Sequence, residues 1–89
     1  MTARREFILG EEKYIDFQVR SSIAQTVVIT SATYELSKPG STAITGICEI
    51  DGDKISTLLE PPEKGTYLFE VTYIIAEETR KVRLNLLVV

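Results

Sequence analysis

Hydrophobic and polar positions alternate most regularly in the stretch 61–75, PPEKGTYLFEVTYII. Five of its apolar side chains fall on one side at every second position, whereas Glu70 and Thr72 fall on the other. The apolar positions are Tyr67, Phe69, Val71, Tyr73 and Ile75. Because successive side chains of a strand point to opposite faces of a sheet, this spacing predicts a half-buried strand. The two prolines and the glycine before it end whatever element precedes them.

The same kind of pattern predicts strands along most of the chain. The segments are 4–9, 13–20, 26–36, 43–50, 54–59 and 80–89, in addition to the one within 61–75. The side chains expected to face inward are Ile15, Phe17 and Val19 in the second segment, Val28, Ala32, Tyr34 and Leu36 in the third, Ile44, Cys48 and Ile50 in the fourth, and Val82, Leu84, Leu86 and Val88 in the last. A helix over 3–25 is the alternative for the start of the chain, but Gly10 and the alternating run after it argue against a helix.

Glycine, proline and aspartate mark the connections between these strands. The segment 37–41, SKPGS, predicts a type II turn, because its proline presets φ and its glycine accepts the positive φ that follows. The pair Asp51-Gly52 is a strong hairpin signal. A further turn is expected over 76–79. Gly46 lies inside a predicted strand, where it indicates a bulge or a close backbone approach.

About seven strands at intervals of about eight to twelve residues, with no convincing helix, predict an all-β fold. The expected architecture is an antiparallel β-sandwich. A chain of 89 residues has room for one hydrophobic core, so residues 1–89 are expected to form a single domain.

Charge and cysteine content narrow the classes of partner and compartment. The net charge of −3 repels a phosphate backbone, so nucleic acid is not an expected partner. No apolar run is long enough to cross a bilayer, and the start of the chain lacks a signal peptide. We therefore expect synthesis in the cytoplasm and no membrane partner. The single Cys48 rules out an internal disulfide, which favours a reducing compartment.

Candidate chemistry is sparse. The chain has no histidine, which removes Ser–His and Cys–His nucleophile pairs and the commonest metal ligand. Cys48 lies at an apolar position of a strand, where a free cysteine behaves as a small hydrophobe. Glu49, Asp51 and Asp53 surround the hairpin tip at alternate positions, but the calcium loop with such spacing is longer and closes with a bidentate glutamate. We expect no enzymatic activity, no catalytic or metal-binding residues and no cofactor.

Two further residue sets offer weak alternatives. Glu60, Glu63 and Glu70 are candidates for a glycosidase carboxylate pair, but nothing in their spacing fixes the required separation. Tyr14 and Tyr73 are candidates for stacking on a sugar, although Tyr73 falls on the core side and the chain has no tryptophan. A surface-type module that binds carbohydrate or peptide is the alternative function.

The end of the chain, 86–89, is apolar on both faces of its predicted strand. Leu87 and Val89 should therefore point away from the core, while Lys81 and Arg83 protect only the first half of the strand. In one interpretation a neighbouring loop around residues 7–9 covers the apolar end. In the other, a further subunit covers it by strand addition or face packing, with Leu87, Val89, Lys81 and Arg83 as the interaction residues.

The order of these motifs resembles that of small immunoglobulin-like proteins from tailed bacteriophages and prophages, among them the N-terminal domains of upper baseplate proteins. The resemblance rests on a Gly-Glu pair before YIDFQVR, the strand SATYEL, a hairpin, and P-x-x-G-T-Y-x-F-x-V before a final apolar strand. Tyr67 in this motif is similar to the tyrosine corner of immunoglobulin-like sandwiches, in which the hydroxyl turns back onto the preceding connection. The resemblance to the phage and prophage proteins covers most of the chain.

This resemblance implies an immunoglobulin-like sandwich with a structural or assembly role and no active site. The expected function is that of a tail, baseplate or head–tail protein that acts through protein–protein contacts and becomes part of a virion. The expected partners are other protein subunits, and a homo-oligomer is one expected form.

Overall fold

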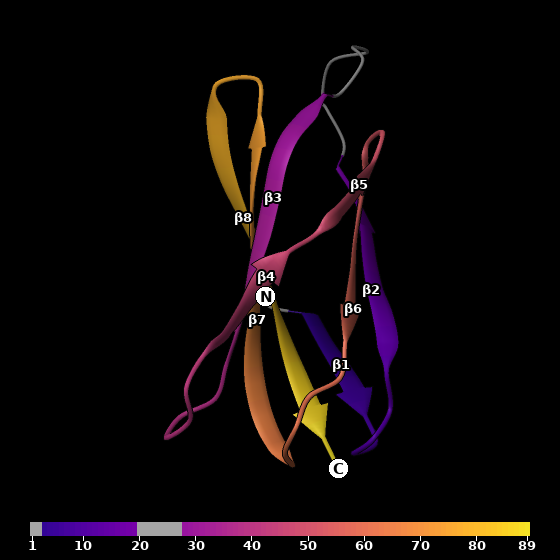
Figure 1. Ribbon diagram of the computed structural model, residues 1–89, viewed down its shortest axis with the longest axis vertical. Coiled ribbons are helices and arrows are strands. Elements are labelled where there is room, and N and C mark those ends of the chain that lie inside the picture. The colour runs from indigo at the N-terminus through magenta and orange to yellow at the C-terminus, as the bar shows by residue number, and fades with distance from the viewer. Residues whose placement is uncertain (1–2, 20–27) are drawn as a thin grey trace.

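The computed structural model describes residues 3–19 and 28–89, and these residues form eight strands and no helix (Figure 1). The strands are β1 (Ala3–Phe7), β2 (Lys13–Gln18), β3 (Ile29–Ser37), β4 (Ile44–Ile47), β5 (Glu49–Asp51), β6 (Lys54–Leu59), β7 (Gly65–Ile75) and β8 (Glu78–Val88). The all-β prediction is therefore confirmed for this part of the chain. Residue 20 of the predicted strand 13–20, residues 26–27 of the predicted strand 26–36, and the whole connection 21–25 between them lie outside the described residues.

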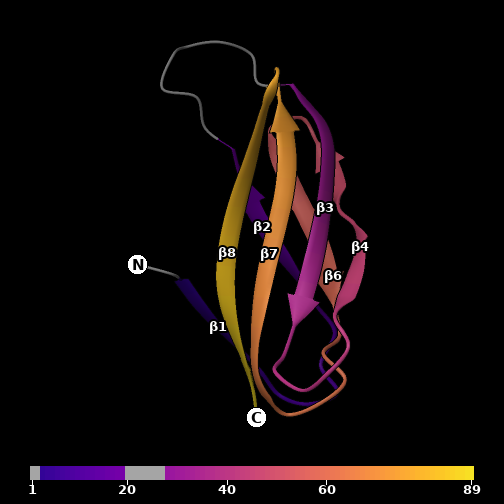
Figure 2. The same ribbon diagram turned by 90° about the vertical axis from the view of Figure 1, so that its left-hand side faces the viewer.

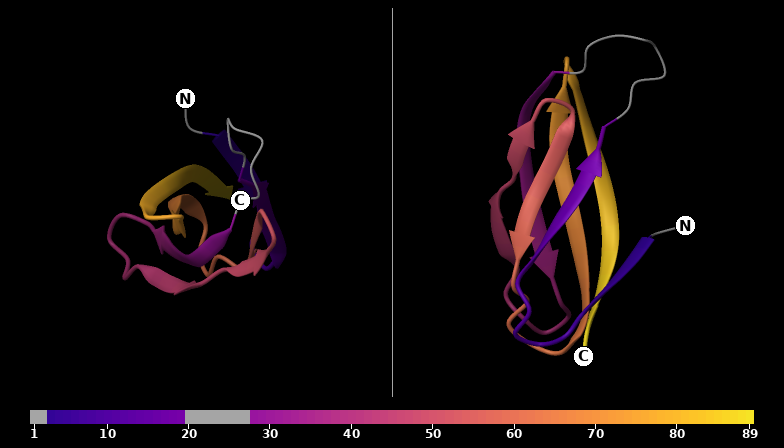
Figure 3. Two further views of the ribbon diagram at one scale, coloured as in Figure 1. Left: turned by 90° about the horizontal axis from the view of Figure 1, so that it is seen from above. Right: turned by 90° about the vertical axis from the view of Figure 1, so that its right-hand side faces the viewer.

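The strands form two sheets that face each other. The five-stranded sheet has the order β1-β8-β7-β3-β4, and the three-stranded sheet has the order β2-β6-β5. Figure 2 shows β8, β7 and β3 in front with β2 and β6 behind them, and Figure 3 shows the same arrangement from two further sides. Neighbouring strands are antiparallel except β1 and β8, which run parallel.

The core lies between the sheets and is made by the alternation that the sequence predicts. In β7 the side chains of Tyr67, Phe69, Val71 and Tyr73 are buried. In β8 the side chains of Leu84, Leu86 and Val88 are buried in the same core. The facing sheet contributes Ile15, Ile55 and Leu59. Ile75 and Val82 are partly buried against this cluster. Because β7 pairs with β8 on one side and β3 on the other, its buried face lies at the centre of the larger sheet.

The predicted inward face of 26–36 is wrong at one position. Ala32 and Leu36 are buried and Tyr34 is partly buried, as expected, but Val28 is 61% exposed and Ile29 is buried in its place. The register of β3 against β7 shifts between Ile29 and Ser31. A bulge adds one residue to a strand, so residues on its two sides follow opposite parity.

The predicted strand 43–50 is two strands, which raises the number above seven. β4 pairs with β3 in the larger sheet, whereas β5 pairs with β6 in the smaller one. The chain crosses between the sheets at Cys48, which is buried and donates its N–H to the carbonyl of Ala32 at 3.0 Å. Ile44 and Ile50 were expected inside but are exposed, because β4 and β5 lie at sheet edges.

The predicted turns are present. The N–H of Ser41 donates to the carbonyl of Lys38 at 3.1 Å and Gly40 has a φ of 83°, as a type II turn requires. The β5–β6 hairpin forms where Asp51-Gly52 predicts one, but its two loop residues are Gly52 and Asp53, because Asp51 ends β5 opposite Lys54. The turn expected over 76–79 is shorter, since β7 ends at Ile75 and β8 begins at Glu78. Gly46 marks a close approach, since a Cβ there would lie 2.6 Å from Cε1 of Tyr34.

Tyr67 ties the connection before β7 to the sheet. Its side chain is buried, and its hydroxyl oxygen accepts a hydrogen bond from the N–H of Glu63 at 3.2 Å. The Nζ of Lys38 lies 5.9 Å from the centre of its ring. The hydroxyl therefore satisfies a backbone donor in the segment where the prolines have ended the preceding ladder.

We expect Tyr67→Phe to lower the free energy of unfolding by about 1 kcal/mol, because the N–H of Glu63 loses its partner while the ring stays packed. Urea denaturation measures the difference. The control is Tyr14→Phe, which removes the hydroxyl of an exposed ring and should leave stability unchanged. Equal stability of Tyr67→Phe and the parent protein would contradict this role.

Candidate interaction surfaces

The apolar end of β8 is covered along its backbone by the start of the chain. β1 pairs with β8 in parallel from Leu84 to Val88. Beyond the ladder, the N–H of Val89 donates to the carbonyl of Phe7 at 2.9 Å, and the N–H of Leu9 donates to the carbonyl of Val89 at 2.8 Å. Leu87 is half-buried opposite Glu6. The backbone in this half of β8 is therefore covered by the start of the chain, including the segment around residues 7–9, as the first interpretation expects.

Three apolar side chains nevertheless remain exposed where these segments meet. Ile8 is 61% exposed, Leu9 42% and Val89 46%. We call these three residues the end patch. A contact of Val89 with another subunit stays a prediction, and the end patch is the surface on which it would form.

Hydrogen bonds hold the segment that carries the end patch. The N–H of Ile8 donates to Oε1 of Glu11 at 2.6 Å, and the N–H of Glu11 donates to the carbonyl of Ile8 at 2.9 Å. The first of these bonds lowers the pKa of the Glu11 carboxyl. Lys13 places its Nζ 3.3 Å from Glu11 and 4.6 Å from the centre of the Phe7 ring. The patch is thus displayed by a fixed turn, which reduces the entropy lost when a partner binds.

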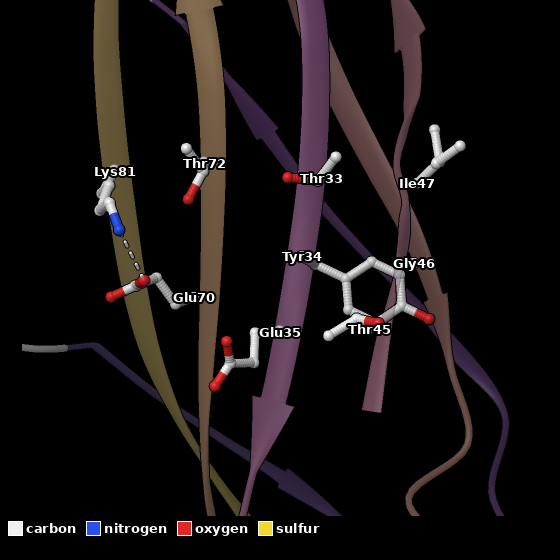
Figure 4. Close-up of a pocket in the computed structure, with 9 residues that line it drawn as sticks. All are labelled: Thr33, Tyr34, Glu35, Thr45, Gly46, Ile47, Glu70, Thr72 and Lys81. Atoms are coloured by element: carbon white, nitrogen blue, oxygen red, sulfur yellow. Dashed lines mark hydrogen bonds and ion pairs between the residues drawn. The ribbon is translucent and has the colours of Figure 1, made fainter. Parts of the chain in front are cut away.

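Lys81 and Arg83 share one carboxylate on the outer face of the larger sheet. The Nε of Arg83 lies 2.6 Å from Oε2 of Glu70. The Nζ of Lys81 lies 3.2 Å from Oε1 of the same carboxylate, and Figure 4 shows this second pair. Hydrogen bonds from Arg83 and then from Lys81 lower the pKa of Glu70. The two cations predicted as interaction residues are therefore partnered within the chain.

A shallow hollow of about 390 Å³ lies beside this network. Its lining residues are Thr33, Tyr34, Glu35, Thr45, Gly46, Ile47, Glu70, Thr72 and Lys81. Glu35 lies directly opposite Glu70 on the neighbouring strand, and no cation within ion-pair distance of Glu35 is found among the described residues. Figure 4 shows the Tyr34 ring lying over β4 at Gly46, and Ile47 farther along the same strand.

Ile47 is the residue that the sequence patterns missed. Its side chain is 84% exposed on β4, and it was not among the predicted interaction residues. A signal for it exists in the sequence, since residues 41–48, STAITGIC, contain no charged side chain. Natural sheets usually protect an edge with charge or proline, and this edge has neither.

The other candidate carboxylates do not form a shared site in the described part of the chain. Glu63 pairs with Lys38 at 3.1 Å, far along the sheet from the Glu70 network. Asp53 accepts a hydrogen bond from the Gln18 amide at 2.8 Å. In the described part of the chain, no group of three or more carboxylates or cysteines is placed to hold a metal ion.

The two tyrosines considered for sugar stacking differ in exposure. Tyr14 is exposed on the smaller sheet, whereas Tyr73 is buried in the core and its ring lies 6.1 Å from that of Phe17. A pair of rings for stacking is therefore not formed by these residues.

Cys48 is buried where the chain crosses between the sheets. The Thr57 hydroxyl donates to its Sγ at 3.1 Å. Burial raises the pKa of the Cys48 thiol, and the bond from Thr57 acts in the opposite direction. A raised pKa keeps the sulfur in its less nucleophilic, protonated form.

No helix that is long and apolar enough to cross a membrane occurs in the described residues. Comparison with known proteins gives no match to a protein family, a curated protein or a solved structure.

We expect Glu70→Gln to weaken the acid dependence of stability. The folded-state pKa of Glu70 is depressed by its two cations, so its contribution is present at neutral pH and is lost as pH falls from about 5 through the folded-state value. The variant should be less stable than the parent at pH 7, and the gap should close in acid. Urea titrations across pH measure this, with exposed Glu49→Gln as the control. An unchanged gap in acid would contradict the assignment.

We expect Cys48 to react with a water-soluble disulfide reagent only as the protein unfolds, because the thiol is buried and its pKa is raised. Absorbance of the released thiolate, followed across a urea series, gives the rate. A Cys48→Ala variant that carries Thr66→Cys supplies an exposed thiol for comparison. Rapid labelling of Cys48 in the native protein would show that the site is accessible.

Proposed function

We propose that the chain is an immunoglobulin-like domain with a structural, non-enzymatic role in a protein assembly. The strand order supports the fold assignment. If β2 to β8 are lettered B, C, C′, D, E, F and G, one sheet reads B-E-D and the other G-F-C-C′, the arrangement of immunoglobulin sandwiches with an added C′ strand. The first strand departs from the constant-type pattern, because it pairs with the last strand of the larger sheet.

Tyr67 supports the same assignment. A tyrosine corner is a tyrosine near the start of strand F whose hydroxyl bonds to backbone a few residues upstream. Tyr67 lies near the start of β7, and its hydroxyl accepts from the N–H of Glu63. The motif read from the sequence thus has the hydrogen bond that gives it its structural role.

The end patch carries the assembly role. Ile8, Leu9 and Val89 are exposed together, on backbone that hydrogen bonds hold in place. Apolar side chains gathered on a fixed surface favour burial against another protein. The three hollows formed by described residues are open and give a small molecule little enclosure, which favours protein contacts over an enclosed ligand site.

The virion context rests on the resemblance of the sequence to immunoglobulin-like proteins of phages and prophages. In this proposal the chain is made in the cytoplasm and enters a tail, baseplate or head–tail structure through contacts with other subunits. The alternative of a carbohydrate- or peptide-binding module has a weaker basis, since Tyr14 has no second exposed ring beside it among the residues considered for that role.

We expect the chain to form a complex with a structural protein encoded by a flanking gene, and Val89→Asp to weaken it by about tenfold or more, because a charge in the apolar contact must be desolvated. Co-expression followed by calorimetric titration of the purified partners measures the affinity. Leu58→Asp, a charge at an exposed leucine of the smaller sheet, is the matched control.

Two results would contradict this proposal. One is the absence of a complex with every flanking structural protein. The other is a complex whose affinity Val89→Asp and Leu58→Asp reduce equally, because the end patch would then have no special part in it.

A further inference from the structure

β4 is an outer strand of the larger sheet and pairs with β3 alone among the described strands. The N–H of Cys48 donates to the carbonyl of Ala32, and the ladder continues with Gly46 opposite Tyr34 and Ile44 opposite Leu36. Backbone groups of successive residues point to opposite sides of a strand. The N–H and C=O groups of Thr45 and Ile47 therefore point away from β3, toward the open side.

The open side of β4 differs from the other open edges in charge. Residues 41–48 contain no charged side chain. Among the other outer strands of the described part, β1 has two arginines and a glutamate, β2 has a lysine and an aspartate, and β5 has a glutamate and an aspartate. The half of β8 that β1 leaves unpaired contains Arg80, Lys81 and Arg83. Charged side chains on an edge disfavour the addition of another strand, so these edges are protected and the edge of β4 is not.

We propose that a second copy of this chain pairs with β4 in antiparallel orientation, so that the two larger sheets become one continuous sheet related by a two-fold axis. This inference rests on the assembly role proposed above and names one partner within it. Directly opposed residues in an antiparallel pair lie on the same face of a sheet. A two-fold axis perpendicular to the sheet must therefore set one residue of β4 opposite the same residue of the partner subunit. If Gly46 is that residue, all residues that form hydrogen bonds between the two copies lie within β4.

In that register, Thr45 lies opposite Ile47 of the partner subunit. The N–H and C=O groups of both residues, which face open solvent in the single chain, bond across the axis. Thr45 and Ile47 also share the outer face of the sheet, because their partners on β3, Glu35 and Thr33, lie on that face. The Ile47 side chain, 84% exposed in the single chain, then packs beside Thr45 of the partner subunit.

Thr45→Pro tests the pairing without breaking the existing sheet. Proline removes a backbone donor, and the donor of Thr45 faces the open side, so the β3–β4 ladder keeps its bonds. We expect sedimentation equilibrium of the full chain, up to the millimolar range, to show a monomer–dimer equilibrium. Thr45→Pro should raise the dissociation constant by about tenfold or more. Thr79→Pro, at the open half of β8, is the matched control and should leave it unchanged.

Two further measurements keep the test decisive if Thr45→Pro fails to fold. Ile47→Lys places a charge of the same sign on each side of the axis and should also raise the dissociation constant about tenfold or more. In the parent protein, the amide hydrogen exchange of Thr45 and Ile47 should slow as concentration rises, whereas that of Thr79 and Lys81 should not.

The inference is overturned if the chain stays monomeric throughout the concentration range. It is also overturned if both β4 variants dimerise like the parent, or if exchange at Thr45 and Ile47 does not depend on concentration. These outcomes are separate from those of the proposed function. A monomer that binds a flanking structural protein through Val89 would remove the β4 dimer and keep the assembly role, and a β4 dimer with no such complex would do the reverse.

Discussion

The fold depends on the packing of one face of β7. Tyr67, Phe69, Val71 and Tyr73 are buried on that face, and the strand has β8 on one side and β3 on the other. The opposite face is mixed, with Leu68 and Ile74 beside Thr66, Glu70 and Thr72. Glu70 forms ion pairs there with Lys81 and Arg83 of β8. A shift of one residue in this strand would exchange the two faces, placing the carboxylate in the core and the aromatic rings in water. Burial of the inner face therefore sets the register of β7 in the larger sheet, and the ion pairs on the outer face are consistent with the same register.

Period-two alternation predicts strands and their faces well wherever pairing is regular. It is correct for β7 and for the second half of β8. Pro39-Gly40 predicts its turn correctly, and Asp51-Gly52 predicts the β5–β6 hairpin one position too early. It fails at Val28, because a bulge in β3 reverses the parity of the residues before it. It also fails over 43–50, where the chain leaves one sheet for the other at Cys48. A local pattern contains no information about which distant strand a segment joins, so neither exception is visible from periodicity alone.

The candidate surfaces depend on the same long-range pairings. Whether the apolar end of β8 is covered depends on where β1 lies. The two strands come from opposite ends of the chain, and the local sequence of neither strand predicts that they pair. For this reason the sequence singled out Val89 but left open what covers its backbone. Ile47 was missed for the opposite reason. The alternation over 43–50 predicts one inward-facing strand, and this prediction conceals that the first half of the segment is an outer strand with an uncharged edge.

The two open edges of the larger sheet differ in a way that limits how the chain can associate. If both edges were uncharged, β4 of one copy could pair with β8 of the next, and such heterologous contacts add copies without end unless the rotation closes a ring. The unpaired half of β8 carries Arg80, Lys81 and Arg83, and β1 occupies the remainder of that edge. Charge on an edge disfavours strand addition. In the dimer that we propose, pairing through β4 uses the same edge of both copies, so the assembly closes after two chains and leaves the charged edges outside. The end patch, on segments joined to β8 at the other side of the sheet, then remains available for a different subunit.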